Sequence, residues 1–298
     1  MKTVTIGIAA YNEENNIYNL LKQIAQQEVL DFEIKSIIVI SDGSTDKTVE
    51  EAQRSKLPQL KVITSTQRRG KAIRLNEIFR QNTSDVIVLF DADIVLGSTH
   101  VIDRLVQPFL DGGVGLVCGW HRSLPPKTFV EKLAVFGAEV WEDAINSLGE
   151  KGEFYHCVGS VRAFSKKWFE GFKFPENVSI SEDLYCFYEA KHRHAKVVIE
   201  TNAFIYIRQP STLRDYIKRT RRTIHAQNDV QGFAPKQETQ KYQCLTEKEK
   251  LNALLAKARK SSAIILVSYI LLQVFVRISS IFSKEKQVWD ISSSTKQI

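Results

Sequence analysis

The sequence has few cysteines, and their arrangement does not indicate disulfide bonds. Its 298 residues include only Cys118, Cys157, Cys186 and Cys244, which show no short paired spacing. Small domains that depend on disulfides have a higher cysteine density at such spacings. We therefore expect four reduced thiols and a protein that faces the cytosol.

The sequence also lacks a signal peptide and an apparent internal repeat. The apolar run at residues 4–10 is short, and polar Tyr11, Asn12 and Glu13 follow it. A secretory leader would have a small-residue cleavage site at that point. We interpret the run as a first buried strand.

The charge balance has no strong bias. The chain has 41 Lys and Arg and 34 Asp and Glu residues, so its formal charge is +7. Such a charge fits nucleic acid, anionic lipid or a phosphorylated substrate, and it does not choose among them. The hydrophobic content of 43% can form a real core, and we expect one catalytic domain with a C-terminal appendage.

The first half of the chain alternates short apolar, β-branched runs with segments of helical periodicity. Strands that alternate with helices predict an α/β fold with a doubly wound, mostly parallel sheet. In such a sheet, ligands bind beyond the carboxyl ends of the strands. The expected strands are residues 4–9, 34–40, 60–64, 86–90 and 114–117, and the expected helices are 13–27, 46–54, 71–81 and 98–110.

The pattern changes after residue 125. A long helix is expected at 128–148, a mixed region that continues the first domain at 154–207, and a basic helix at 212–228. The polar, glutamine-rich segment that follows is typical of a linker. We predict a catalytic domain at residues 1–228, a linker at 229–246 and a helical, membrane-associated region at 247–298.

The last region contains a nearly continuous apolar run at residues 263–276, which continues past Arg277 to Phe282. Apolar residues would cover this helix all round, so we expect it to cross a membrane or to lie in its surface. The alternative is a buried helix docked on the catalytic domain or on a second subunit. The membrane interpretation places the protein on the cytoplasmic face, peripheral or anchored by one segment.

Two acids follow the fourth expected strand. Asp91 and Asp93 bracket a small residue, so both carboxylates can point at one divalent cation, which prefers oxygen ligands. Such a cation would neutralise a diphosphate leaving group. A solvated turn is the alternative for an isolated pair of this kind.

The turn after the second strand and the start of the third helix also have candidate ligands for a nucleotide. Asp42 can accept hydrogen bonds from a base or a ribose, although the rest of its motif also fits a turn with a helix cap. Lys71 lies where its charge and the helix dipole would both attract a diphosphate. The alternative for Lys71 is an exposed surface lysine.

Five motifs occur in order along the chain: Tyr11-Asn12-Glu13, Asp42-Gly43-Ser44-Thr45-Asp46, Gly70-Lys71-Ala72, Asp91-Ala92-Asp93 and Ser181-Glu182-Asp183. In order and approximate spacing, these motifs together resemble the inverting family 2 glycosyltransferases with the GT-A fold. The resemblance covers residues 1–228.

The resemblance implies a role for each motif. Tyr11, Glu13 and Asp42 would hold the nucleoside of the donor, which the resemblance favours as a uridine-linked sugar. Lys71 would contact the phosphates. Asp91 would bind the donor through a manganese or magnesium ion that it shares with Asp93.

The same resemblance assigns the proton transfer. Asp183 would be the general base that activates the acceptor hydroxyl, so that transfer inverts the anomeric centre. The alternative is that Glu182 is the base, or that Glu182 orients Asp183. Without the family, Ser181-Glu182-Asp183 fits a helix N-terminus with a cap and two acids. The family often places an acceptor loop where Gly159 and Ser160 stand.

The basic helix departs from the pattern of the processive members. Arg222 stands where many of them have a tryptophan, which argues against long-chain polymer synthesis and for limited transfer to a saccharide or lipid-linked acceptor. Arg221 and Arg222 would contact the departing diphosphate. The alternative is a basic face on anionic lipid headgroups.

Three other functions remain open at this point. A nucleotidyltransferase would have a glycine-rich basic loop after the first strand, where this chain has Tyr11 and its neighbours. A non-catalytic module could bind membranes through the basic helix, whereas nucleic acid is disfavoured because Tyr216 is its only ring. A polyprenyl-phosphate sugar transferase is the alternative within the enzyme class.

Overall fold

The computed structural model describes residues 1–175, 182–229, 241–281, 293–296 and 298. They form two compact units. The first unit contains Met1–Arg122, Cys157–Arg208 and Lys296–Ile298, and the second contains Ser123–His156 and Gln209–Thr295.

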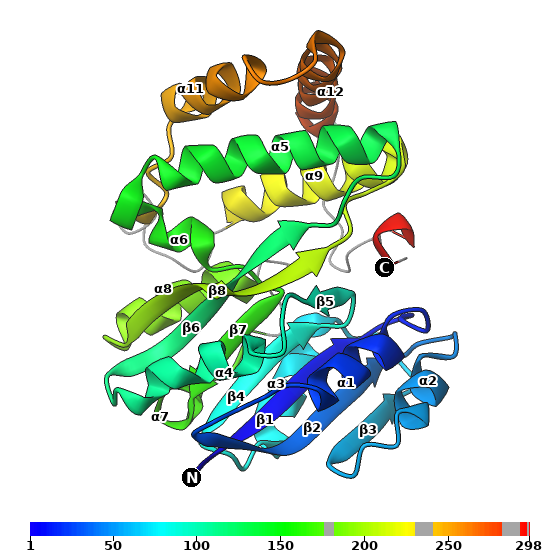
Figure 1. The fold of residues 1–298 in the computed structure, drawn as a ribbon, viewed down its shortest axis with the longest axis vertical. Coiled ribbons are helices and arrows are strands. Elements are labelled where there is room, and N and C mark those ends of the chain that lie inside the picture. The colour runs from blue at the N-terminus through cyan, green and yellow to red at the C-terminus, as the bar shows by residue number, and fades with distance from the viewer. Residues whose placement is uncertain (176–181, 230–240, 282–292, 297) are drawn as a thin grey trace. The chain divides into compact units, whose positions relative to one another are not determined.

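A mixed sheet forms the centre of the first unit (Figure 1). In the described part of the chain it has eight strands in the order β3-β2-β1-β4-β7-β6-β8-β5. The first four strands in this order are parallel, and β7 pairs antiparallel with β4 and β6. The strands are β1 (Lys2–Ala10), β2 (Phe32–Asp42), β3 (Leu60–Ser65), β4 (Val86–Asp91), β5 (Ile94–Leu96), β6 (Val114–Ser123), β7 (Val161–Ser165) and β8 (Lys196–Ile207).

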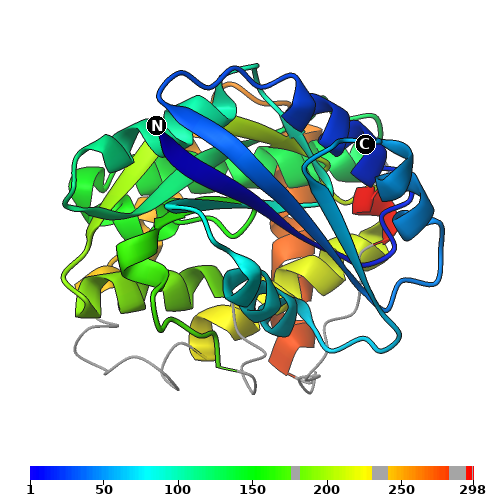
Figure 2. The same ribbon diagram turned by 90° about the horizontal axis from the view of Figure 1, so that it is seen from below.

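Helices cover both faces of this sheet, and Figure 2 shows α1 and α3 on opposite faces. Val4, Ile6 and Ile8 of β1 belong to the same core cluster as the buried face of α1. On the other face, a Cβ added to Gly7 would lie 2.5 Å from Cγ2 of Ile78, so glycine allows α3 to pack close to β1. The helices of this unit are α1 (Ile17–Ala25), α2 (Thr48–Arg54), α3 (Lys71–Gln81), α4 (Val101–Val106), α7 (Lys166–Phe169) and α8 (Glu182–His192).

The strand register brings the predicted motifs to one edge of the sheet. In the parallel pairs, Ala10 is opposite Ser41 and Ala9 is opposite Asp91. The segments after β1, β2 and β4 therefore start at neighbouring points. Because β7 runs antiparallel to β4, its beginning also lies there, and the Asp91 amide donates to the Ser160 carbonyl at 3.1 Å.

The predicted α/β fold of the GT-A type is confirmed, and α3 has the predicted bounds. The sheet is mixed rather than mostly parallel, because β7 pairs antiparallel with β4 and β6, and β5 pairs antiparallel with β8. Two helix predictions are wrong at their ends. Helix α1 begins only at Ile17, because the amides of Asn16 and Ile17 both donate to the Glu13 carbonyl in a preceding turn. Helix α4 ends at Val106, and a 3-10 turn follows around Pro108, which has no amide hydrogen to continue the helix.

The second unit is helical. It contains α5 (Phe129–Asn146), η2 (Gly149–Gly152), α6 (Glu153–His156), α9 (Leu213–Asp229), α11 (Glu247–Ala258) and α12 (Ala263–Ile281), and a 3-10 turn η4 spans Ser293–Lys296. Thr128 and Glu131 cap α5 by accepting each other's amide hydrogens, a capping box that fixes where this helix begins. Phe136 and Val140 of α5 pack with Ala253 of α11, and Ala134 packs with Tyr216 of α9 and Val276 of α12.

Helix α12 has two different apolar faces. One face packs inside the unit, where Leu266, Tyr269 and Leu272 contact the clusters around α5 and α9. The opposite face is exposed along Ile264, Val267, Leu271, Val274, Phe275 and Ile278. This is the one helix of the described chain that is long and apolar enough to cross a membrane.

The boundaries predicted at 228 and 246 stay predictions. Residues 230–240 of the predicted linker lie outside the described residues. Leu245, near its end, is buried against the α5 cluster. Phe282, the predicted end of the apolar run, also lies outside the described residues.

Candidate active site

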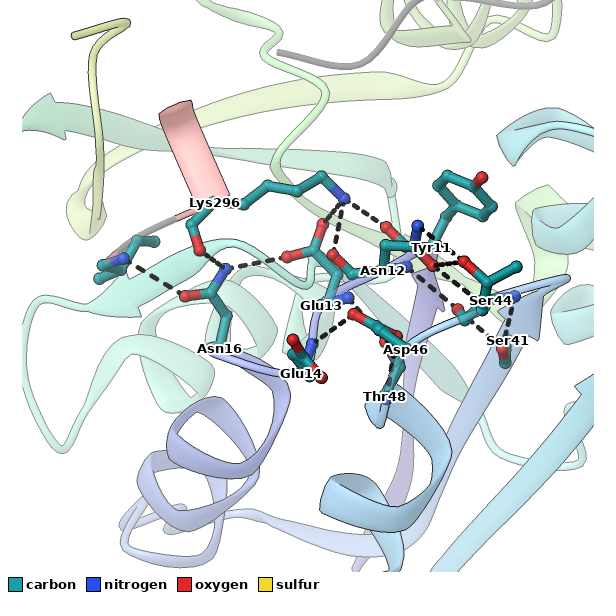
Figure 3. Close-up of polar contacts among 12 residues, drawn as sticks. Tyr11, Asn12, Glu13, Glu14, Asn16, Ser41, Ser44, Asp46, Thr48 and Lys296 are labelled. Atoms are coloured by element: carbon teal, nitrogen blue, oxygen red, sulfur yellow. Dashed lines mark hydrogen bonds and ion pairs between the residues drawn. The ribbon is translucent and has the colours of Figure 1, made fainter. Parts of the chain in front are cut away.

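The turns after β1 and β2 are joined by hydrogen bonds. The Thr45 amide donates to Asn12 Oδ1 at 2.8 Å, and the Asn12 amide donates to Ser44 Oγ at 3.1 Å. The Glu13 amide donates to Thr48 Oγ1 at 2.7 Å. Asn12 has a positive φ of 53°, which asparagine tolerates better than most residues. Two predicted motifs therefore form one connected pair of turns (Figure 3).

Glu13 is a buried carboxylate held between two polar partners. Its Oε1 lies 2.5 Å from Nζ of Lys296, and its Oε2 accepts a hydrogen bond from Asn16 Nδ2 at 2.9 Å. Burial and the nearby charge of Asp93 raise the pKa of the Glu13 carboxyl to about 7, although Lys296 and Asn16 oppose the shift. A residue that is distant in sequence thus holds the acid that was predicted to bind the nucleoside (Figure 3).

Asp42 anchors the turn that precedes α3. Its Oδ1 accepts from the Arg69 amide at 2.8 Å and from Arg74 Nε at 2.6 Å, while Oδ2 accepts from the Gly70 amide at 2.8 Å. Hydrogen bonds to an ionised acceptor are among the strongest in proteins. In this structure Asp42 therefore positions Gly70 and, with it, Lys71; its contact with a nucleoside stays a prediction.

Gly43 allows this turn to approach the end of β2. Its φ is +72°, and an added Cβ would lie 2.8 Å from the backbone nitrogen of Arg68. The Arg68 guanidinium in turn lies 4.3 Å from the centre of the Tyr11 ring, a cation–π contact. The turns after β1, β2 and β3 are therefore mutually fixed, and Tyr11 lies where they meet.

Lys71 connects the predicted metal acids with the predicted base motif. Its Nζ lies 2.6 Å from Asp91 Oδ1 and 2.5 Å from Glu182 Oε1. Burial would lower the pKa of this ammonium, but Asp91 and Glu182 together raise it above its ordinary value. Lys71 therefore stays charged between two acids that are 91 residues apart in sequence.

Asp91 and Asp93 have the electrostatics of a cation site. Burial and the charge of Asp91 raise the pKa of the Asp93 carboxyl, and a divalent cation would relieve this repulsion. Within the described ranges, no group of three or more His, Cys, Asp or Glu side chains could hold a metal ion. Hard divalent cations such as Mg2+ commonly keep some of their ligand positions for water and phosphate oxygens.

The two acids that open α8 differ in their surroundings. Lys71 and Arg162 lower the pKa of Glu182 to about 2, although burial alone would raise it. Burial and the charge of Glu182 raise the pKa of the Asp183 carboxyl, while Arg162 opposes the shift. Glu182 is thus a fixed anion, and Asp183 is the better proton acceptor of the two. Ser181, the predicted cap, lies outside the described residues.

The main chain before β7 lies against this acid pair. A Cβ added to Gly159 would be 3.3 Å from both Asp183 Oδ2 and Glu182 Oε1. The Gly159 carbonyl also accepts a hydrogen bond from Arg162 Nη2 at 3.2 Å. The segment that was predicted to be an acceptor loop therefore contacts the predicted base.

Sequence reasoning missed Arg162 and Lys296. Arg162 is fully buried in β7, where its guanidinium lies 3.5 Å from Glu182 Oε1 and 3.2 Å from Cys186 Sγ. Its signal in the sequence is an arginine inside an apolar strand, because a buried charge needs partners. Lys296 has no such signal, since it lies in a short polar stretch.

Arg221 and Arg222 belong to α9 in the second unit. Arg221 Nε donates a hydrogen bond to Ser279 Oγ of α12 at 3.3 Å, and Arg222 is exposed. The predicted contact of these two arginines with the donor diphosphate stays a prediction. The same holds for their alternative contact with lipid headgroups.

Known proteins share both the sequence pattern and the fold. The sequence profile described as glycosyl transferase family 2 matches residues 5–172. A dolichol-phosphate mannosyltransferase of Pyrococcus furiosus is 34% identical over 112 residues, which are 37% of this chain and 30% of that protein. A poly-beta-1,6-N-acetyl-D-glucosamine synthase of Staphylococcus aureus is 28% identical over 134 residues, 45% of this chain and 32% of that protein. The matches thus span about a third of these relatives' length.

A mannosyltransferase from Pyrobaculum calidifontis, solved in complex with GDP-Man and Mn2+, has a similar fold. Its TM-score is 0.64 with 19% sequence identity, over 95% of this chain and 88% of that chain. At this identity the likeness shows the fold alone. Because the family profile covers more than half of the sequence, the chain belongs to glycosyl transferase family 2, which confirms the predicted family and enzyme class.

Proposed function

We propose that this chain transfers a sugar from a nucleoside-diphosphate sugar to a saccharide or lipid-linked acceptor, with inversion at the anomeric carbon. The observation that carries the proposal is the position of Lys71 between Asp91 and Glu182, with ion pairs of 2.6 and 2.5 Å. Lys71 therefore links Asp91, one of the two acids proposed to bind the metal at the leaving diphosphate, to Glu182, the neighbour of the proposed base.

On the donor side, Asp91 and Asp93 would hold Mn2+ or Mg2+ on the diphosphate. The cation, when bound, neutralises the charge that develops on the leaving group. Lys71 contributes a second positive charge at the same place. Tyr11, Glu13 and Asp42 form or support the turns that receive the nucleoside. A uridine donor follows from the family resemblance, whereas the similar mannosyltransferase from Pyrobaculum calidifontis binds a guanosine donor, GDP-Man.

On the acceptor side, Asp183 takes the proton of the attacking hydroxyl. A new bond forms between that oxygen and the anomeric carbon, the bond from this carbon to the diphosphate breaks, and the nucleoside diphosphate leaves. Glu182 acts through Lys71 and Arg162, which hold it as an anion 2.5 and 3.5 Å away. The raised pKa of Asp183 supports this division, because a base must be able to accept a proton.

A polyprenyl-phosphate acceptor is the second candidate within this class. The dolichol-phosphate mannosyltransferase relative favours it, as does the exposed apolar face of α12. The poly-N-acetylglucosamine synthase relative favours a saccharide acceptor instead. The proposed location is the cytoplasmic face of a membrane, peripheral or anchored by one segment, and the exposed apolar face of α12 supports it.

The test is nucleoside-diphosphate release from uridine- and guanosine-linked sugars. Each donor is incubated with Mn2+, with Mg2+ or with a chelator, and with polyprenyl phosphate or membrane extract as acceptor. Metal-dependent release that requires an acceptor and is lost in Asp183→Asn supports the proposal. Release that the chelator leaves unchanged contradicts the metal role, and release by Asp183→Asn at the wild-type rate contradicts the base.

A further inference from the structure

Lys296 and Ile298 contact the turn after β1 through the side chain of Asn16. The Asn16 amide nitrogen donates to the Lys296 carbonyl at 2.8 Å, and its Oδ1 accepts from the Ile298 amide at 3.4 Å. The same nitrogen donates to Glu13 Oε2 at 2.9 Å. Asn16 is buried, so one amide group recognises both the docked main chain and the carboxylate (Figure 3).

The side chain of Lys296 completes this contact. Its ammonium lies 2.5 Å from Glu13 Oε1, donates to the Asn12 carbonyl at 3.1 Å and also donates to the Tyr11 carbonyl. It lies 5.7 Å from the centre of the Tyr11 ring. Lys296 therefore contacts three consecutive residues of the turn that was predicted to bind the nucleoside.

We propose that Lys296 is a positioning residue of the donor site, which holds Glu13 and the Tyr11–Asn12 main chain in the conformation that receives the nucleoside. The inference rests on the proposed function of this turn. It adds a residue nearly 300 positions along the chain to a site whose other members come from the strand ends.

The count of hydrogen bonds favours positioning over direct contact with the donor. A lysine ammonium has three N–H donors, and the three oxygens of Tyr11, Asn12 and Glu13 use all of them. Lys296 therefore acts through the turn. Without it, two carbonyls and a buried carboxylate lose their shared partner, and Asn12 keeps a left-handed conformation with less support.

The opposite possibility is that the Lys296 side chain blocks the site and must move away before the donor binds. The two possibilities predict opposite changes in affinity. Removal of a positioning residue weakens nucleotide binding, because part of the binding energy must then order the turn. Removal of a blocking residue strengthens binding.

The experiment is calorimetric titration of UDP and of GDP, each with Mn2+, into the full chain and its variants. Lys296→Met removes the ammonium and keeps the length of the side chain. We expect its dissociation constant to rise about tenfold, the effect of losing hydrogen bonds to a charged group. Lys296→Arg should recover part of the loss. Lys35→Met is the matched control, because Lys35 is exposed near the start of β2, away from the strand ends that form the site, and its binding should match the wild type.

A double-mutant cycle separates positioning from general damage. Glu13→Gln removes the charge that Lys296 holds but leaves the Tyr11 and Asn12 carbonyls, so Lys296→Met should weaken binding by less in that background than in the wild type. In steady-state assays the donor KM should rise while kcat stays within about twofold, since Lys296 does not contact the reacting atoms. Thermal unfolding of each variant verifies that it is folded at the assay temperature.

The outcomes are distinct. If the nucleotide affinity of Lys296→Met is unchanged, the inference is overturned. If Lys296→Met binds the nucleotide more tightly than the wild type, Lys296 blocks the site, which also overturns the inference. Fully additive losses in the cycle show that Lys296 does not act through Glu13, which overturns that part of the inference. If the wild type binds neither nucleotide, the proposed function itself fails. If the wild type binds a nucleotide and Lys296→Met binds it equally well, only the inference about Lys296 fails.

Discussion

Two neighbouring acids in this site have opposite electrostatic surroundings, and their pKa shifts support the different roles proposed for them. Lys71 and Arg162 hold Glu182 as an anion with a pKa of about 2, whereas burial and Glu182 itself raise the pKa of Asp183. A general base needs access to both protonation states, which Glu182 lacks near neutral pH. The sequence alone left both acids open as the base, because adjacent positions carry no information about their partners.

The first residue-scale prediction concerns Asp183 and Asp93. Asp183→Asn keeps the shape of the side chain but removes proton acceptance, so we expect kcat to fall by about 10² to 10⁴ with donor affinity retained. Asp93→Ala should abolish transfer by weakening binding of the metal and the donor. Calorimetry with nucleoside diphosphate and Mn2+ separates the two variants, and an equal loss of donor binding in both would contradict these roles.

The second residue-scale prediction concerns Arg162. Its side chain is fully buried and faces Glu182 and Gly159. Arg162→Met leaves the Glu182 carboxylate with one cation fewer in a buried place, so we expect a loss of about 3 to 5 kcal/mol in the free energy of unfolding. Urea denaturation measures this loss. Arg54→Met is the control, because Arg54 is an exposed arginine that also pairs with a glutamate, Glu51, and its loss should cost about 1 kcal/mol or less.

At the scale of elements, local signals predicted α3 and the strand ends but not the start of α1. Gly70 and the periodicity after it define α3 at Lys71–Gln81, as predicted. The start of α1 depends on the polar turn at Glu13, whose partners come from α2 and from Lys296. Contacts between residues so far apart are set by the folded sheet, and periodicity cannot reveal them.

The element-scale prediction tests how tightly the turn after β2 is packed. Gly43→Ala places a Cβ at 2.8 Å from the Arg68 nitrogen in a residue with a φ of +72°. We expect a loss of about 1 to 3 kcal/mol in stability and weaker nucleotide binding, since the turn must move away from residues 67–68. Gly112→Ala is the matched control, because no atom lies within 4 Å of its added Cβ and its φ is not positive. Equal melting temperatures for the two variants would contradict the close approach.

At the scale of the whole molecule, the candidate active site and the exposed apolar face of α12 belong to different units. The candidate site lies in the first unit, and the exposed apolar face of α12 belongs to the second. The sequence predicted the apolar run, but it could not predict which face of the helix is buried, because apolar residues occur all round it. The structure assigns one side to α5 and α9, and it leaves Val267, Leu271 and Phe275 exposed.

This division predicts that membrane binding can be removed without loss of nucleotide binding. Leu271→Asp combined with Phe275→Asp places two charges on the exposed face of α12, where the wild-type side chains are 66% and 56% exposed. Charges there cost about 2 to 3 kcal/mol each in a membrane, so we expect the variant to stay in the supernatant when sedimented with vesicles that contain anionic lipid. Because these side chains point away from the packing around α5, calorimetry should find UDP or GDP affinity within about twofold of the wild type.

The control for this variant is Leu30→Asp, which replaces another exposed leucine, 73% exposed in the first unit. It should sediment with vesicles as the wild type does. If the α12 variant still sediments with the vesicles while Leu30→Asp behaves as expected, the exposed face of α12 is not the membrane contact. The basic residues of α9, which include Arg214 and Arg222, then become the surface to test, because their binding to anionic lipid would weaken as the salt concentration rises.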